Sequence, residues 1–168
     1  MKNDKSIFFV MGVSGSGKTT IGKLLAKKMH APFFDGDSYH PQANVEKMAE
    51  GHPLNDKDRQ GWLQRLNQLA LDQKEEGAVI ACSALKHKYR KILRENVEEA
   101  VEFIYLEGSF ALISQRLQGR KGHFMPPELL RSQFEALEIP KIAISVSIDA
   151  TPTNIVEAIL EKLGRKPV

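Results

Sequence analysis

The sequence has little of what marks secreted, membrane-spanning or nucleic-acid-binding chains. Among its 168 residues there is one cysteine, Cys82, which excludes an internal disulfide framework and makes the cytoplasm the expected compartment. No apolar run approaches the roughly 20 residues of a membrane span, and no secretory signal precedes the first apolar run. The net charge is only +3, with basic residues interleaved among acidic ones. We therefore expect neither a membrane partner nor a nucleic-acid partner.

The chain has the ordinary composition of a globular protein, with 42% hydrophobic and 27% charged residues. Its length suits one domain over residues 1–168, since chains of about 150 residues bury roughly two-thirds of their unfolded surface. A single cluster of basic residues stands out, and it consists of Lys86, Lys88, Arg90, Lys91 and Arg94. This cluster is either a solvated helix face or the edge of a site for an anionic ligand.

Short β-prone apolar runs alternate with longer segments of helical periodicity. The predicted strands are 7–11, 32–34, 78–82, 101–106 and 143–148. The predicted helices are 18–29, 42–50, 57–76, 87–95, 110–117, 127–137 and 152–163. Ser109 and Thr151 are expected N-caps, and Gly51, Gly77 and Gly164 are expected helix stops. The alternation predicts an α/β fold in which helices cover both faces of a five-stranded parallel sheet, with ligands at the carboxyl ends of the strands.

A phosphate-binding loop follows the first predicted strand and opens the first predicted helix. The segment Gly12-Val13-Ser14-Gly15-Ser16-Gly17-Lys18-Thr19 matches G-x-x-x-x-G-K-[ST] in full. Such a loop wraps phosphates with its backbone N–H groups, and the helix dipole adds positive potential. We predict that residues 12–20, including Thr20, bind ATP, that Lys18 reaches the β- and γ-phosphates as a catalytic residue, and that Thr19 is a Mg²⁺ ligand. The alternative is a flexible Gly/Ser loop.

Two carboxylates follow the second predicted strand, in Asp35-Gly36-Asp37. Their position after a central strand suits a P-loop NTPase fold of the nucleoside monophosphate kinase type, with three layers. One carboxylate is expected near Mg²⁺, and the other is expected to accept a hydrogen bond from the attacking hydroxyl. An ordinary turn is the alternative, because Asp and Gly both favour turns.

Motifs spread over most of the chain resemble the gluconokinase family, in its bacterial, thermoresistant type. They are Asp35-Gly36-Asp37, His40-Pro41, 44–48, 52–56, Asp58-Arg59, Trp62-Leu63, 82–86, Tyr89-Arg90, 120–125 and Ser132-Gln133-Phe134. The resemblance implies ATP-dependent phosphorylation of D-gluconate at its 6-hydroxyl, giving 6-phospho-D-gluconate and ADP. It also implies a homodimer.

Site roles follow from joining this resemblance to the chemistry of the side chains. Asp37 is expected to orient or deprotonate the hydroxyl, and Asp35 to lie nearer the metal. Arg59 and Lys86 are candidates for the gluconate carboxylate, because a guanidinium and an ammonium both bind carboxylates. Either could instead be a surface ion-pair partner. His40 and His123 lie in motifs of the family and are expected to contact the substrate.

A short lid is predicted at about residues 119–126, where glycines flank Arg120 and Lys121. Arg120 is the expected catalytic cation of this lid, although an ordinary exposed basic loop would have the same composition. Arg116 resembles the arginine that covers adenine in related small kinases, with residues 151–152 on the other side of the base. A solvated helix arginine is the alternative.

The third predicted strand, Cys82 and Trp62 limit where the metal ligands and the reactive groups can lie. The third strand ends at Ser83 without the aspartate that usually supports Mg²⁺, and the gluconokinase family is similar there. Metal support is therefore expected from Thr19, Asp35, water and the nucleotide itself. Cys82 is expected to be a buried, inert thiol, and Trp62 a core residue. Two other functions remain open, a kinase of the same fold acting on shikimate or a nucleotide, and a non-catalytic ATP-binding module.

Overall fold

The computed structural model describes residues 6–119 and 126–164. Five parallel strands form one sheet in the order β2-β3-β1-β4-β5. The strands are β1 (Ile7–Met11), β2 (Phe33–Asp35), β3 (Ala78–Ala81), β4 (Val101–Glu107) and β5 (Ile144–Ser147). The α-helices are α1 (Lys18–Met29), α2 (Gln42–Ala49), α3 (Asp56–Gln73), α4 (His87–Leu93), α5 (Phe110–Gln118), α6 (Pro127–Ala136) and α7 (Pro152–Lys162). The predicted α/β fold is confirmed, but the strand before Asp35 and Asp37, β2, is an edge strand and not the central strand expected.

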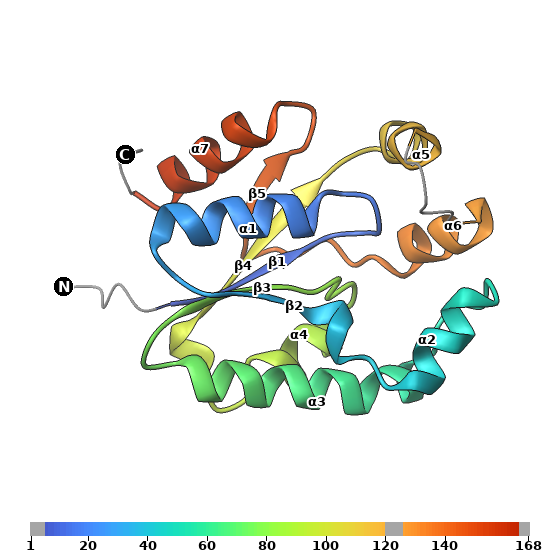
Figure 1. Cartoon of the computed structure of the whole chain (residues 1–168), viewed down its shortest axis with the longest axis horizontal. Coiled ribbons are helices and arrows are strands. Elements are labelled where there is room, and N and C mark those ends of the chain that lie inside the picture. The colour runs from blue at the N-terminus through green and yellow to red at the C-terminus, as the bar shows by residue number, and fades with distance from the viewer. Residues whose placement is uncertain (1–5, 120–125, 165–168) are drawn as a thin grey trace.

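Helices cover both faces of the sheet, so the structure has three layers. Figure 1 shows α1 and α7 on one face, α3 and α4 on the other, and α2, α5 and α6 beyond one end of the sheet. Every residue of β1 and of β3 is buried, which explains why these strands are continuous apolar runs without alternation. Phe9 of β1 stacks on Phe103 of β4, with ring centroids 5.4 Å apart.

The register of the strands sets the geometry of the site. Val10 of β1 and Asp35 of β2 are both aligned with Ala81 of β3. Because neighbouring strands are about 4.8 Å apart, Asp35 lies roughly 10 Å from Val10 across the sheet. The segments that follow β1 and β2 therefore leave the sheet at the same level.

The predicted helix ends are largely those observed. The hydroxyls of Ser109 and Thr151 accept hydrogen bonds from the amides of Leu112 and Asn154, as N-caps do. Gly51, Gly77 and Gly164 follow α2, α3 and α7 with positive φ, as expected. Three features were not predicted, namely a capping box between Asn55 and Asp58 at the start of α3 and two short 3₁₀ helices, η1 (Gly36–Tyr39) and η2 (Glu98–Ala100).

Both residues expected in the core are found there. Cys82 is fully buried, and burial raises the pKa of its thiol to about 12. The side chain is therefore a protonated, unreactive thiol near neutral pH. Trp62 is also buried, and its indole N–H donates to the Gly36 carbonyl at 2.8 Å. Within 6–119 and 126–164, no helix is both long and apolar enough to cross a bilayer.

Candidate active site

The phosphate-binding loop joins β1 to α1 at the carboxyl end of the sheet. Gly12 and Gly15 have φ of 154° and 79°, and a Cβ at either position would meet an atom within 3 Å, Ser16 Oγ and Leu117 Cγ respectively. Ser16 Oγ is buried and has no hydrogen-bond partner within the described residues. Crowded glycines and a buried, unsatisfied hydroxyl fit a loop that closes tightly around phosphate oxygens.

Lys18 and Thr19 face the loop and the second strand. The Lys18 ammonium donates to the carbonyls of Gly12 and Val13, each at 3.0 Å, so it lies over the mouth of the loop. Thr19 Oγ1 lies 3.5 Å from Asp35 Oδ2. The other oxygen of Asp35 accepts from the Asp37 amide at 3.0 Å, which caps η1 and fixes the carboxylate. The two predicted metal ligands are thus brought together.

A cavity of about 380 Å³ adjoins the phosphate loop on the side of α5 and α7. Thr20, Arg116 and Pro152 are among the residues that line it. The Arg116 guanidinium donates to the Ile148 carbonyl at 2.7 Å, which holds this side chain against the cavity wall. Residues predicted to bind the phosphates of the nucleotide and residues predicted to bind its base therefore line the same cavity.

The second predicted carboxylate, Asp37, lies on η1 with 74% of its side chain exposed. His40 follows it, and its ring is only 5% exposed. The ring stacks on Trp62 with a centroid distance of 4.0 Å, and its Nε2 lies 4.0 Å from Asp37 Oδ1. Burial lowers the pKa of His40 more than the nearby carboxylate raises it, so the imidazole is neutral near pH 7.

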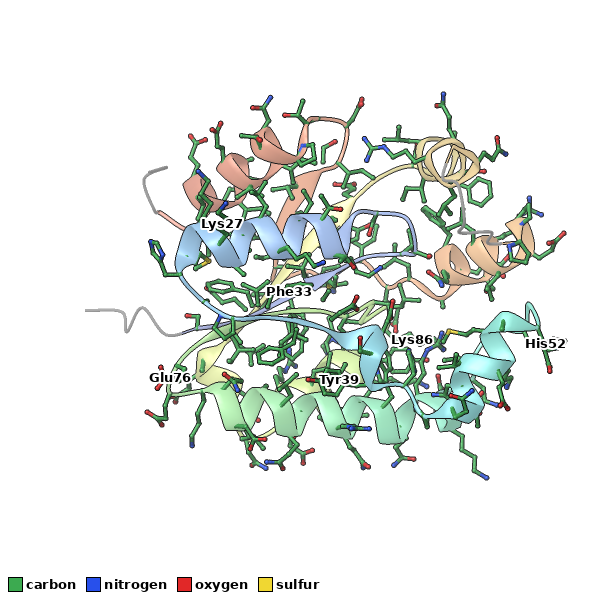
Figure 2. All side chains as sticks on the ribbon, in the orientation of Figure 1. Lys27, Phe33, Tyr39, His52, Glu76 and Lys86 are labelled. Atoms are coloured by element: carbon green, nitrogen blue, oxygen red, sulfur yellow. The ribbon has the colours of Figure 1, made fainter. Side chains whose placement is uncertain are left out.

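The two cations predicted to bind the substrate carboxylate both lie near the Tyr89 ring, within about 6 Å of its centroid. The Arg59 guanidinium donates to the Leu54 carbonyl at 2.6 Å and to the Tyr89 hydroxyl at 3.2 Å. Lys86 contacts Asp56 at 3.4 Å, and its ammonium lies 5.7 Å from the centre of the Tyr89 ring. Figure 2 shows Lys86 toward the same end of the sheet as Tyr39 of η1, whereas Glu76 and Lys27 lie toward the opposite end.

Asp56 is the internal counter-ion of this cationic cluster. Its carboxylate accepts hydrogen bonds from the Lys88 ammonium and the Tyr89 hydroxyl, and these bonds hold the pKa of Asp56 well below its usual range. Lys86 and Lys88 lie beside this carboxylate, and Arg59 is linked to it through the Tyr89 hydroxyl, so positive charge is in excess. Such a cluster favours an additional anion. Lys86 is also a surface ion-pair partner, as the alternative hypothesis expected.

Two predicted residues, Arg120 and His123, lie outside the described residues, as does most of the predicted lid. Gly119, at the start of that segment, is the C-cap of α5.

Two residues near the site were assigned no individual role by the sequence-based prediction. Gln133 of α6 accepts a hydrogen bond from the Ser14 amide of the phosphate loop at 2.6 Å. Arg90 is only 4% exposed and donates to the carbonyls of Ala84 and Glu138, which ties the segment after β3 to the segment after α6. Both residues lie in motifs that resemble the gluconokinase family. Arg90 also belongs to the predicted basic cluster, and its burial shows that it is not part of a solvated helix face.

Comparisons with known proteins agree with this geometry. The model of the shikimate kinase family matches residues 14–163. The thermoresistant gluconokinase of Escherichia coli K12 is 44% identical over 169 residues, which cover 97% of this chain and 96% of that protein. The thermosensitive gluconokinase of the same organism is 47% identical over 156 residues, covering 89% and 83%. The crystal structure of a gluconokinase from Sinorhizobium meliloti 1021 has a TM-score of 0.90 at 38% identity, covering 97% and 94%.

Proposed function

Because the chain belongs to the gluconokinase family, within the shikimate kinase group of P-loop kinases, we propose that it phosphorylates D-gluconate. The reaction transfers the γ-phosphoryl group of ATP to the 6-hydroxyl and gives 6-phospho-D-gluconate and ADP. The observation that carries the proposal is the meeting, at one edge of the sheet, of a phosphate loop, an exposed carboxylate and a cluster with excess positive charge.

Gluconate needs this combination because its reactive hydroxyl and its carboxylate are at opposite ends of a six-carbon chain. A site for it requires a hydroxyl acceptor near the γ-phosphate and an anion-binding group some distance away. Asp37, exposed on η1, suits the first requirement. Arg59 and Lys86 suit the second requirement, because the one carboxylate in their cluster, Asp56, does not balance their positive charge.

The nucleotide is held by residues 12–20, with Lys18 on the β- and γ-phosphates. Arg116 and Thr20 border the cavity that suits the base. Thr19 and Asp35 would hold Mg²⁺, which neutralises charge on the phosphates when bound. The described residues contain no group of three or more His, Cys, Asp or Glu arranged for a metal. The remaining ligands of Mg²⁺ would therefore come from the nucleotide and water.

In the transfer step, Asp37 accepts a hydrogen bond from the 6-hydroxyl and directs its oxygen lone pair at the γ-phosphorus. Lys18 stabilises the charge that moves toward the leaving ADP. Arg120 and His123 remain predicted contacts of the phosphoryl group and the substrate. The single domain over 1–168, the cytoplasmic location and the homodimer likewise stay predictions.

An ADP-release assay with ATP and Mg²⁺ tests the substrate. The acceptors compared are D-gluconate, shikimate, AMP, glucose and none. Stimulation by gluconate alone is the expected result. Stimulation by shikimate or AMP would indicate the other small-molecule kinases, and no stimulation by any acceptor would favour the ATP-binding module.

A further inference from the structure

Asn44 of α2 is a buried polar residue that the proposed reaction does not use. It is 4% exposed, on a helix that otherwise has no buried residue. Its amide nitrogen donates to the backbone carbonyl of Asp58 at 2.8 Å and lies 3.3 Å from Nδ1 of His40. A buried side-chain amide destabilises the fold unless it is hydrogen-bonded. The two partners of the Asn44 amide nitrogen therefore indicate the role of this residue.

The Asp58 carbonyl determines which way the Asn44 amide faces. A carbonyl oxygen only accepts, so the amide nitrogen, and not the amide oxygen, must point toward it. The same nitrogen is the atom near His40, and an amide nitrogen only donates. Nδ1 of His40 must therefore be the acceptor, and the proton of the neutral ring must lie on Nε2.

The protonated Nε2 lies near the Asp37 carboxylate. Nε2 lies 4.0 Å from Asp37 Oδ1, and the ring cannot tilt freely because it stacks on Trp62 at 4.0 Å. The opposite tautomer would place an N–H against the Asn44 amide nitrogen, so two donors would face each other. The neighbouring charges on His40 are those of Asp37 and Arg59.

Asp37 lacks a fixed side-chain position without such a donor. Its backbone is held, because its amide donates to Asp35 and the adjoining Gly36 carbonyl accepts from Trp62. Its carboxylate, however, is largely exposed and can rotate. A reacting group that is misplaced by about 1 Å can lose roughly a hundredfold in rate.

We propose that Asn44 and His40 are positioning residues for Asp37. Asn44 selects the Nε2–H tautomer of His40, and that N–H donates to Oδ1 of Asp37 when the substrate binds, leaving Oδ2 for the acceptor hydroxyl. The 4.0 Å separation shortens to hydrogen-bond length in the complex, as such contacts commonly do. This inference rests on the role of Asp37 in the proposed function.

The tautomer can be measured on the unmodified protein by ¹⁵N-resolved NMR of the histidine rings. His40→Gln, compared with the wild type, identifies the His40 signals. We expect a protonated Nε2 and an unprotonated Nδ1 near neutral pH. A protonated Nδ1 would overturn the inference, and it would do so even if gluconate proves to be the substrate.

Kinetics then test whether the tautomer serves Asp37. Asn44→Ala is expected to lower kcat for the acceptor about tenfold to a hundredfold, while KM for ATP stays unchanged. Asn67→Ala is the matched control, because the Asn67 amide also donates to two backbone carbonyls, those of Leu93 and Glu95, at 2.9 Å each. It should lose stability without losing kcat. An equal loss of kcat in both variants would show a merely structural role and overturn the inference.

Rescue by side-chain geometry gives a second criterion. The amide nitrogen of His40→Gln can occupy the place of Nε2, whereas that of His40→Asn reaches only the place of Nδ1. We expect His40→Gln to retain clearly more kcat than His40→Asn at similar melting temperatures. The reverse order would overturn the inference. If gluconate fails as an acceptor but the NMR result holds, the proposed function fails and the tautomer assignment stands.

Discussion

Replacing Asp37 by asparagine separates the transfer step from nucleotide binding. The change keeps the shape of the side chain and removes its charge. The carboxylate is 74% exposed, and the hydrogen bond to Asp35 comes from the backbone amide of residue 37, which the substitution keeps. The fold, the Thr19–Asp35 contact and the phosphate loop should therefore be unaffected.

The expected loss is in kcat. Orientation and partial deprotonation of a hydroxyl by a positioned group typically contribute 10²–10⁴-fold, which corresponds to about 3–5 kcal/mol of activation free energy. We expect Asp37→Asn to lose kcat within this range, while the dissociation constant for ATP, measured by calorimetry, stays close to that of the wild type. Asp72→Asn, on the distant end of α3, serves as a charge-matched control. A kcat equal to that of the wild type would remove Asp37 from the reaction, and a parallel loss of ATP affinity would show that the carboxylate acts through the nucleotide site.

Three further predictions concern the cations and their partners. Arg59→Gln should raise KM for gluconate about tenfold or more, because a charge-assisted hydrogen bond contributes about 1.5–3 kcal/mol; an unchanged KM in steady-state assays would assign Arg59 to the structure alone. Arg90→Met leaves the carbonyls of Ala84 and Glu138 without a donor, so it should lower the free energy of unfolding by about 1–3 kcal/mol in denaturant titrations. Lys91→Met, at an exposed position, should not. Equal denaturation midpoints for the two variants would contradict this prediction. Hydrogen bonds in the folded state lower the pKa of Asp56 from 3.8. The contribution of this carboxylate to stability is therefore present above pH 3.8 and is lost as pH falls below it. The difference in melting temperature between Asp56→Asn and the wild type should shrink below about pH 4, and a difference independent of pH would contradict these hydrogen bonds.

Local patterns in the sequence were sufficient for most of the fold. The β-prone runs and helical periodicities lie within two or three residues of the observed elements, because each apolar face is repeated along the chain. Gly36–Tyr39 was missed, since a single 3₁₀ turn is too short to show a period. The capping box of Asn55 and Asp58 lacks the usual Glu or Gln at its third position, so its signal was weak.

The site was predictable where its chemistry is local. The phosphate loop and Asp35-Gly36-Asp37 are contiguous motifs, and the parallel sheet brings them to one edge. Contacts between distant segments have no such signal. Gln133 reaches the Ser14 amide from 119 residues away, and only the folded chain shows that contact.

The direct test of the central claim is the identity of the product. The enzyme would be incubated with ATP, Mg²⁺ and D-gluconate carrying ¹³C at position 6, and the product observed by ¹³C and ³¹P NMR. We expect the C6 signal to become coupled to phosphorus while ADP accumulates in equal amount. Release of inorganic phosphate alone, or a phosphorylated product whose C6 signal is not coupled to phosphorus, would contradict phosphorylation at the 6-hydroxyl.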